Sequence, residues 1–275
     1  MPNIITNSYA VFKESFLILR KNKAMLIFPV LSGIACAITI LSFIFSAILS
    51  IDSSGWLSLL LLFVCYLVIY FICIFFSSAM IISASLRLKG KKPSVLDAIE
   101  IAGKNIGHIL SWALFSATIG IVLDLIDKII GKRFDFLTAI LGAVWSLATF
   151  FVIPVMVFEN KTPLNAMKES TALFKKRWGE TITGWVGIGL PIILLWVLGL
   201  LLLAGATKVL SDIIFLSLLP FFIAYTILLV ILHNAMNSIY VAALYYFATT
   251  GEVKGEYSEK TIRNAGLLRR LTPSG

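Results

Sequence analysis

The sequence is poor in charged side chains, and this shortage excludes most classes of water-soluble protein. Charged residues make up 13% of the chain, whereas hydrophobic residues make up 59%. A soluble domain has about a quarter of its residues charged, so these charges are too few to cover a 30.3 kDa globule, and much of the surface must face lipid. The net charge of +9 does not indicate nucleic acid, because the basic residues flank apolar stretches as topology signals do.

Cysteine and histidine are also scarce, with 3 and 2 residues respectively. Cys36, Cys65 and Cys73 all lie within apolar stretches, which favours neither a disulfide framework nor a zinc site. The sequence shows no nucleotide-binding loop, and no paired acid and base or Ser/His arrangement that would carry a reaction. We therefore predict no catalytic residue, no cofactor, no metal site and no enzymatic activity.

The sequence does contain a series of long apolar runs. Each reaches the roughly 20 residues that a helix needs to cross about 30 Å of hydrocarbon. In lipid such runs must be helical, because the backbone has to satisfy its own hydrogen bonds. We therefore predict an all-α, polytopic transmembrane bundle of six spans, of which the second and last exceed the bilayer and should tilt, kink or run along the interface. The predicted spans are 25–49, 56–86, 107–126, 136–158, 181–206 and 213–247.

The lysines and arginines predict the orientation of these spans. With a cytoplasmic N-terminus, all but four of the 23 basic residues lie on the inner side, and the reversed orientation inverts that count. We therefore expect both termini in the cytoplasm, a single transmembrane domain over 1–251 and a basic cytoplasmic tail over 252–275. The first apolar run is too long, and begins too late, for a cleaved signal peptide. The four outer basic residues are Lys128, Lys132, Arg133 and Lys208.

Three inner segments carry apolar residues at helical spacing and basic residues on other faces. The second begins with a capping box, Ser94 and Asp97, and the third with Thr162 before Pro163. Such basic amphipathic helices either lie at the inner headgroup boundary beside anionic lipid or form a collar that gates a cavity or docks a partner. Their apolar positions are Ile5, Tyr9, Phe12, Phe16 and Leu19; Val95, Ile99, Ala102 and Ile106; and Leu164, Met167, Thr171, Phe174 and Trp178.

The amphipathic segments precede the first, third and fifth spans, which suggests a threefold parallel repeat. The repeat units would be 3–86, 94–158 and 163–248, each an amphipathic helix followed by an out-and-back hairpin. The tripeptide Lys-Glu-Ser occurs at 13–15 and again at 168–170, and a basic cluster follows each copy in register. Parallel repeats occur in transporters and in other membrane proteins, so the repeat alone selects no function.

Three short segments resemble known membrane families. FFVIPVMVFE at 150–159 looks like a motif of several uncharacterised prokaryotic membrane families, and of the membrane-embedded part of some glycerophosphodiester phosphodiesterases. FPVLSG at 28–33 and AALYYFATTG at 242–251 are similar to the same group, particularly to one six-helix domain-of-unknown-function family. These motifs mark helix ends rather than chemistry. The resemblance therefore implies the fold and a multi-pass location in a prokaryotic cell (inner) membrane, and it implies no activity.

Candidate site residues are the polar positions inside the apolar spans, because such groups are unfavourable in lipid. His233, Asn234 and Asn237 lie in the sixth span, where they either line a substrate or proton site or hydrogen-bond to neighbouring helices. Gly187 and Pro191 lie in a glycine-rich part of the fifth span. That part is the best candidate for a broken helix, of the kind that builds transporter sites.

Three classes of function remain. A small-molecule or lipid permease requires a water-accessible cavity near His233 and Pro191. A structural or scaffolding protein requires a tightly packed core and no transport. An intramembrane enzyme has the least support, because no catalytic arrangement is visible. The expected partner is the bilayer, with anionic headgroups at the inner face; the sequence indicates no nucleic acid, names no protein partner and is compatible with a homo-oligomer.

Overall fold

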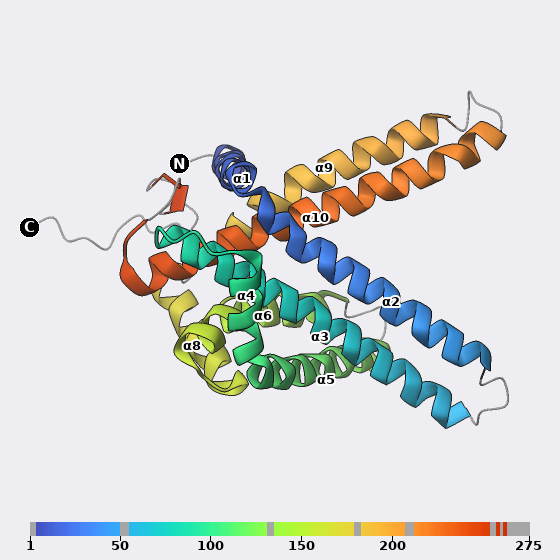
Figure 1. Cartoon of the computed structure of the whole chain (residues 1–275), viewed down its shortest axis with the longest axis horizontal. Helices are drawn as coiled ribbons and strands as arrows, with labels where there is room; N and C mark the ends of the chain where they lie inside the picture. Colours follow the sequence, from blue (N-terminus) through green and yellow to red (C-terminus); the bar gives the residue numbers. More distant parts are fainter. Residues whose placement is uncertain are drawn as a thin grey trace, which may run out of the picture. The chain divides into compact units, whose positions relative to one another are not determined.

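All the regular elements that the structure describes are helices (Figure 1), which confirms the all-α prediction. The contacts divide the chain into two compact units, one formed by residues 1–26 with 177–275 and the other by residues 27–176. The structure, a computed structural model, describes residues 4–49, 55–130, 135–178, 183–206, 212–253, 257–258 and 261–262.

The first unit consists of a helical hairpin and an amphipathic helix that lies across it. The hairpin is formed by α9 (Thr183–Ala206) and α10 (Asp212–Thr250), and α1 (Ile4–Lys21) contacts both of its helices. A short 3-10 helix, η1 (Lys23–Leu26), follows α1 and also contacts α10. In Figure 1, α1 is seen almost end-on while α9 and α10 run across the page. The amphipathic helix therefore crosses the hairpin instead of extending it.

The second unit contains two hairpins and two amphipathic helices. The first hairpin pairs α2 (Ile27–Leu49) with α3 (Gly55–Leu88), and the second pairs α5 (Ile106–Ile130) with α6 (Asp135–Thr149). The amphipathic helix α4 (Val95–Lys104) contacts α3 and α5, and the short helix α7 (Val152–Glu159) also contacts these two. The remaining helix of this unit is α8 (Pro163–Trp178).

The described residues contain six helical segments long and apolar enough to cross a membrane, which confirms the predicted number. α3 has 34 residues and α10 has 39, and neither is interrupted. At 1.5 Å per residue they measure about 51 and 58 Å, well beyond the hydrocarbon thickness. Pro220 lies inside α10, which continues through it. The segments are Lys23–Ser46, Gly55–Leu88, Ile106–Leu123, Ile140–Glu159, Ile188–Gly205 and Leu216–Thr250.

The break expected in the fifth span lies instead in the fourth. α9 runs without interruption through Gly187 and Pro191, because a membrane helix tolerates the loss of the one hydrogen bond that proline removes. The fourth span is divided at Phe150 and Phe151 into α6 and α7. Pro154 stands in the first turn of α7, where backbone N–H groups have no partner within the helix. Its missing N–H is therefore tolerated there.

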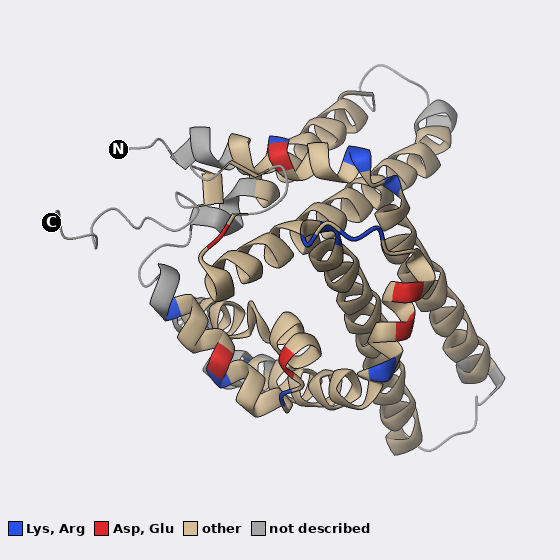
Figure 2. Ribbon diagram, turned by 60° about the vertical axis from the view of Figure 1, so that its left-hand side comes forward, with Lys and Arg blue, Asp and Glu red and all other residues tan. Residues whose placement is uncertain are grey.

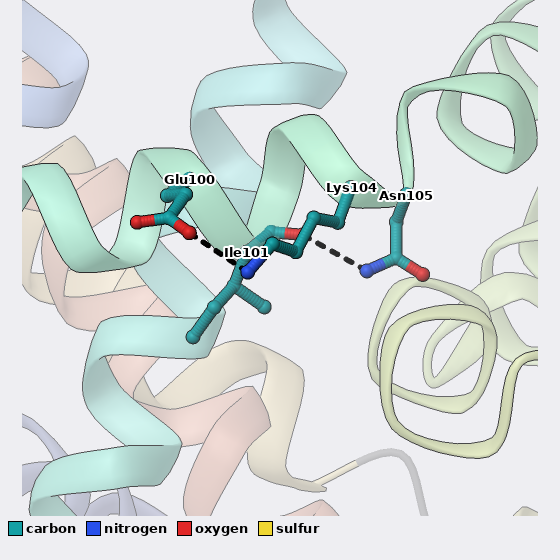
Figure 3. Close-up of polar contacts among 4 residues, drawn as sticks. All are labelled: Glu100, Ile101, Lys104 and Asn105. Atoms are coloured by element: carbon teal, nitrogen blue, oxygen red, sulfur yellow. Dashed lines mark hydrogen bonds and ion pairs between the residues drawn. The ribbon is translucent and has the colours of Figure 1, made fainter.

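The three predicted amphipathic helices form as α1, α4 and α8, and α4 begins with the predicted capping box. The Ser94 N–H donates to the Asp97 carboxylate at 2.8 Å, and the Asp97 N–H donates to Ser94 Oγ at 3.1 Å. Hydrogen bonds with Ser94 lower the pKa of Asp97 below its ordinary value, and the bond from the Ser94 backbone N–H contributes most. At the other end the Asn105 side-chain amide donates to the Ile101 carbonyl at 2.9 Å, beside an exposed Glu100–Lys104 ion pair (Figure 3).

The faces that these helices bury in the protein differ from the predicted apolar faces. Each helix buries a pair of small or medium side chains four residues apart, and α1 also buries Leu19 of the predicted face, whereas other large predicted residues such as Tyr9 and Leu164 are exposed. Small side chains allow helices to approach closely but add little to a hydropathy pattern, so the pattern indicates mainly the exposed apolar face and not the face that packs on the protein. The buried pairs are Val11 with Ser15, Ala98 with Ala102, and Ala166 with Ser170; of these, only Ala102 belongs to the predicted set.

α4 and α8 each contact the hairpin that comes before them in the chain. α4 contacts α3 of the first hairpin, and α8 binds the corner between α6 and α7 through Ser170 and Phe151. α1 packs on α9 and α10, which come much later in the chain. The boundaries of the three repeat units stay a prediction.

Candidate functional site

Side-chain hydrogen bonds and a close approach of a ring to a glycine join the described parts of α9 and α10. Tyr225 Oη donates to the Leu195 carbonyl at 2.6 Å, and Trp196 Nε1 donates to Thr226 Oγ1 at 3.3 Å. The Tyr225 ring lies against Gly199, where an added Cβ would be only 2.5 Å from the ring atom Cε1. Gly199 therefore provides the space that the Tyr225 ring occupies.

Towards the N-terminal end of α9, the two helices leave a recess of about 410 Å³. Its walls are mainly apolar, and none of the described residues that line it is an Asp, Glu, Lys or Arg. Two of these residues, Ile193 and Val230, are 57% and 53% exposed, so the recess opens at the surface of the hairpin. His233 and Asn234 supply polar groups at one end.

The structure brings together only some of the residues that the sequence selects. His233 and Asn234 line the recess, and the His233 Nδ1 atom is buried with no hydrogen-bond partner among the described residues. Asn237 is half-buried one turn further along α10 and, like Pro191 in α9, is not among the lining residues. For Gly187 the structure describes only its place within α9. Gly189, which belongs to the glycine-rich part of the fifth span, and Thr226, which no sequence pattern indicates, also line the recess.

The first copy of Lys-Glu-Ser attaches the segment after α10 to α1. Ser15 is fully buried, and its Oγ lies 2.6 Å from the Tyr257 hydroxyl. The Glu14 carboxylate accepts the Ser258 N–H at 3.2 Å and the Thr261 hydroxyl at 2.9 Å. Burial raises the pKa of Tyr257, so its hydroxyl stays protonated and available for the bond to Ser15.

The second copy of Lys-Glu-Ser holds the break in the fourth span. Ser170 is fully buried, and its Oγ accepts the Phe151 N–H at 2.9 Å. Glu169 binds Lys161 at 3.1 Å, and Lys161 also binds Glu159 at 2.8 Å. The pKa of Lys161 is raised, mainly because its ammonium group is hydrogen-bonded to Glu159. In both copies the serine makes a buried hydrogen bond and the glutamate binds a nearby segment. In the sequence, the only sign of these shared contacts is that the tripeptide occurs twice.

Charged residues are concentrated on the short helices and near helix ends, whereas the long apolar helices carry few of them (Figure 2). α2 and α9 contain no Asp, Glu, Lys or Arg at all. Six membrane-length helices with this charge distribution define a multi-pass membrane protein of the all-α class. The chain matches a family of unknown function (DUF6159) over residues 56–255 and belongs to that family. No curated protein and no solved structure matches the chain significantly.

Proposed function

We propose that this protein is a lipid permease that takes an amphipathic molecule from the bilayer into the recess between α9 and α10. The observation that carries the proposal is the recess itself, with apolar walls, an open side and polar groups at one end. Its volume of about 410 Å³ is in the range of small-molecule sites. The alternative is a structural or scaffolding protein without transport.

The lining favours a lipid over a water-soluble solute. A charged or strongly polar solute needs compensating charges or hydrogen bonds when it leaves water, and the described wall offers few of these. An acyl chain gains by lying against residues such as Ile192 and Leu229. The exposed Ile193 and Val230 mark the side from which a chain would enter directly from the bilayer.

His233 gives the recess a place for a polar headgroup. A buried nitrogen without a partner costs about 1–3 kcal/mol of stability, and the Nδ1 atom is such a group. If the imidazole turned toward the recess, a headgroup could hydrogen-bond to this nitrogen and remove the penalty, while Asn234 beside it is exposed and adds an amide. The polar end of the recess would thus select the headgroup, and the apolar walls would hold the chain.

Filling the recess should abolish lipid binding. In full-length protein reconstituted with a lipid that carries a photoactivatable acyl chain, we expect Ile193→Trp to lower labelling of the residues that line the recess, because the indole occupies the entrance, while the lipid-exposed residues elsewhere on α9 and α10 stay labelled. His233→Leu should lower labelling about 2- to 30-fold, as expected for one membrane hydrogen bond of 0.5–2 kcal/mol. Leu201→Trp is the matched control, because Leu201 is also exposed on α9 but does not line the recess.

The same vesicles separate transport from binding. Transfer of a fluorescent lipid between leaflets should fall in Ile193→Trp and persist in Leu201→Trp. Equal labelling of the two variants would contradict the recess as a binding site. Labelling without any transfer would contradict the permease and favour the scaffolding alternative.

The proposal includes a prokaryotic cell membrane with both termini on the cytoplasmic side, as the positive-inside bias favours. Gly55 and Lys91 are exposed residues near opposite ends of α3. In a cysteine-free background and intact cells, an impermeant maleimide should label Gly55→Cys at once, and Lys91→Cys only after permeabilisation. The opposite result would reverse the orientation. The resemblance to the membrane-embedded part of glycerophosphodiester phosphodiesterases stays a prediction, and we propose no enzymatic activity.

A further inference from the structure

α1 has two distinct faces, and only one of them packs against the protein. The packed face consists of Val11, Ser15, Ile18 and Leu19, all of which are buried. A second face carries an exposed stripe in which aromatic and cationic side chains alternate at spacings of four, three and four residues. This stripe, the α1 stripe, consists of Tyr9, Lys13, Phe16 and Arg20.

The aromatic members of the α1 stripe are exposed. Tyr9 is 63% exposed and Phe16 is 41% exposed, and the ring of Phe12 stacks on Phe16 with centroids 6.3 Å apart. Leaving this much apolar surface in water is unfavourable, and exposed apolar patches commonly mark contact with a membrane or a partner. Aromatic rings of this kind are enriched at the boundary between headgroups and hydrocarbon.

The cationic members of the α1 stripe are available for an external anion. Within the described part of the chain, no carboxylate forms an ion pair with Lys13 or Arg20. Lys161 differs from them, because Glu159 and Glu169 already bind it. A lysine or arginine beside an apolar surface can lay its stem along that surface and extend its charge to the phosphates.

We infer that the α1 stripe binds the anionic headgroups of the leaflet at the inner end of the α9–α10 hairpin. The orientation of α1 fits this role, because α1 lies across the hairpin (Figure 1) and its stripe therefore runs along the membrane plane. The rings of Tyr9 and Phe16 enter the boundary region, and Lys13 and Arg20 bind phosphates. This surface is independent of the recess and does not require transport.

The test places a nitroxide at Leu17, beside the stripe, in full-length cysteine-free protein in nanodiscs. The discs contain either phosphatidylcholine alone or phosphatidylcholine with phosphatidylglycerol. Relaxation by oxygen, compared with relaxation by a water-soluble nickel chelate, gives the ratio of inserted to solvated states. We expect a higher ratio with phosphatidylglycerol, because each basic residue near an anionic surface contributes roughly a fivefold preference.

The variants separate charge from aromatic anchoring. The double variant K13Q/R20Q should lower the inserted ratio roughly 30-fold in phosphatidylglycerol discs, as two such charges predict, and should change it little in phosphatidylcholine. The double variant Tyr9→Ser with Phe16→Ser should lower the inserted ratio in both kinds of disc. K161Q removes one charge that carboxylates already bind and should have no effect. A nitroxide that stays accessible to nickel in every disc would overturn the inference. So would a ratio of inserted to solvated states that changes neither with phosphatidylglycerol nor in K13Q/R20Q.

Discussion

Replacing Gly199 with alanine should destabilise the α9–α10 hairpin by about 1–3 kcal/mol, the usual penalty for an overpacked site. The new Cβ would lie 2.5 Å from Tyr225 Cε1. The ring cannot move away freely, because its hydroxyl donates to the Leu195 carbonyl at 2.6 Å. Unfolding of the purified protein by increasing mole fractions of dodecyl sulfate in mixed micelles, followed by circular dichroism, would measure the loss.

Two further variants identify the cause of that loss. Gly205 lies on the same helix, and an added Cβ there would meet nothing within 4 Å; Gly205→Ala should be neutral or slightly stabilising, since alanine favours helix by about 1 kcal/mol over glycine. Tyr225→Leu removes the ring that clashes, so adding Gly199→Ala to it should have little further effect. If Gly199→Ala is as stable as Gly205→Ala, the close packing of Gly199 against Tyr225 is wrong.

Replacing Ser170 with alanine should destabilise the second unit by a similar amount, about 1–3 kcal/mol, because it removes a buried hydrogen-bond acceptor from a backbone N–H. That N–H belongs to Phe151, and both residues are fully buried. The loss should concentrate at the break between α6 and α7. Hydrogen exchange in nanodiscs would show it as faster exchange in peptides that contain residues 150–156.

Thr171→Val is the matched control for Ser170→Ala. Thr171 is the next residue of α8, and its hydroxyl donates to the Met167 carbonyl of the same helix, so it holds no other segment. We expect its exchange pattern around Phe151 to match that of the wild type. Equal protection of Phe151 in the Ser170→Ala variant would mean that the fourth span breaks without help from α8.

The number of spans is predictable because it depends on local composition, whereas the place of the break is not. Long runs of Leu, Ile and Phe can only be helical in lipid, so the sequence predicts six spans without any tertiary information. The break at Phe151 depends on Ser170, which is 19 residues away. The local signal, glycine followed by Pro191, points to α9 instead, where the helix continues.

The packing faces and the recess are not predictable for a related reason. Hydropathy selects large residues such as Tyr9 and Leu164, but the faces in contact with the protein use Ser15, Ala98 and Ala166. Close approach of helices depends on the absence of side-chain bulk, which a hydropathy pattern does not record. The sequence selects His233 and Asn234 correctly as polar residues within a span, but their place opposite Gly189 depends on how α9 pairs with α10.

The docking of α1 on the last hairpin has a consequence for biosynthesis. The residues that receive α1 begin at Thr183, roughly 160 residues after α1 ends. At about 5–20 residues per second, the ribosome needs about 8–30 s to add the intervening chain. During that time Val11 and Ser15 have no native contact, so the emerging N-terminal helix has to wait at the membrane surface. α1 is thus synthesised long before it can reach its final place, and a nascent chain that stops before α9 leaves α1 undocked.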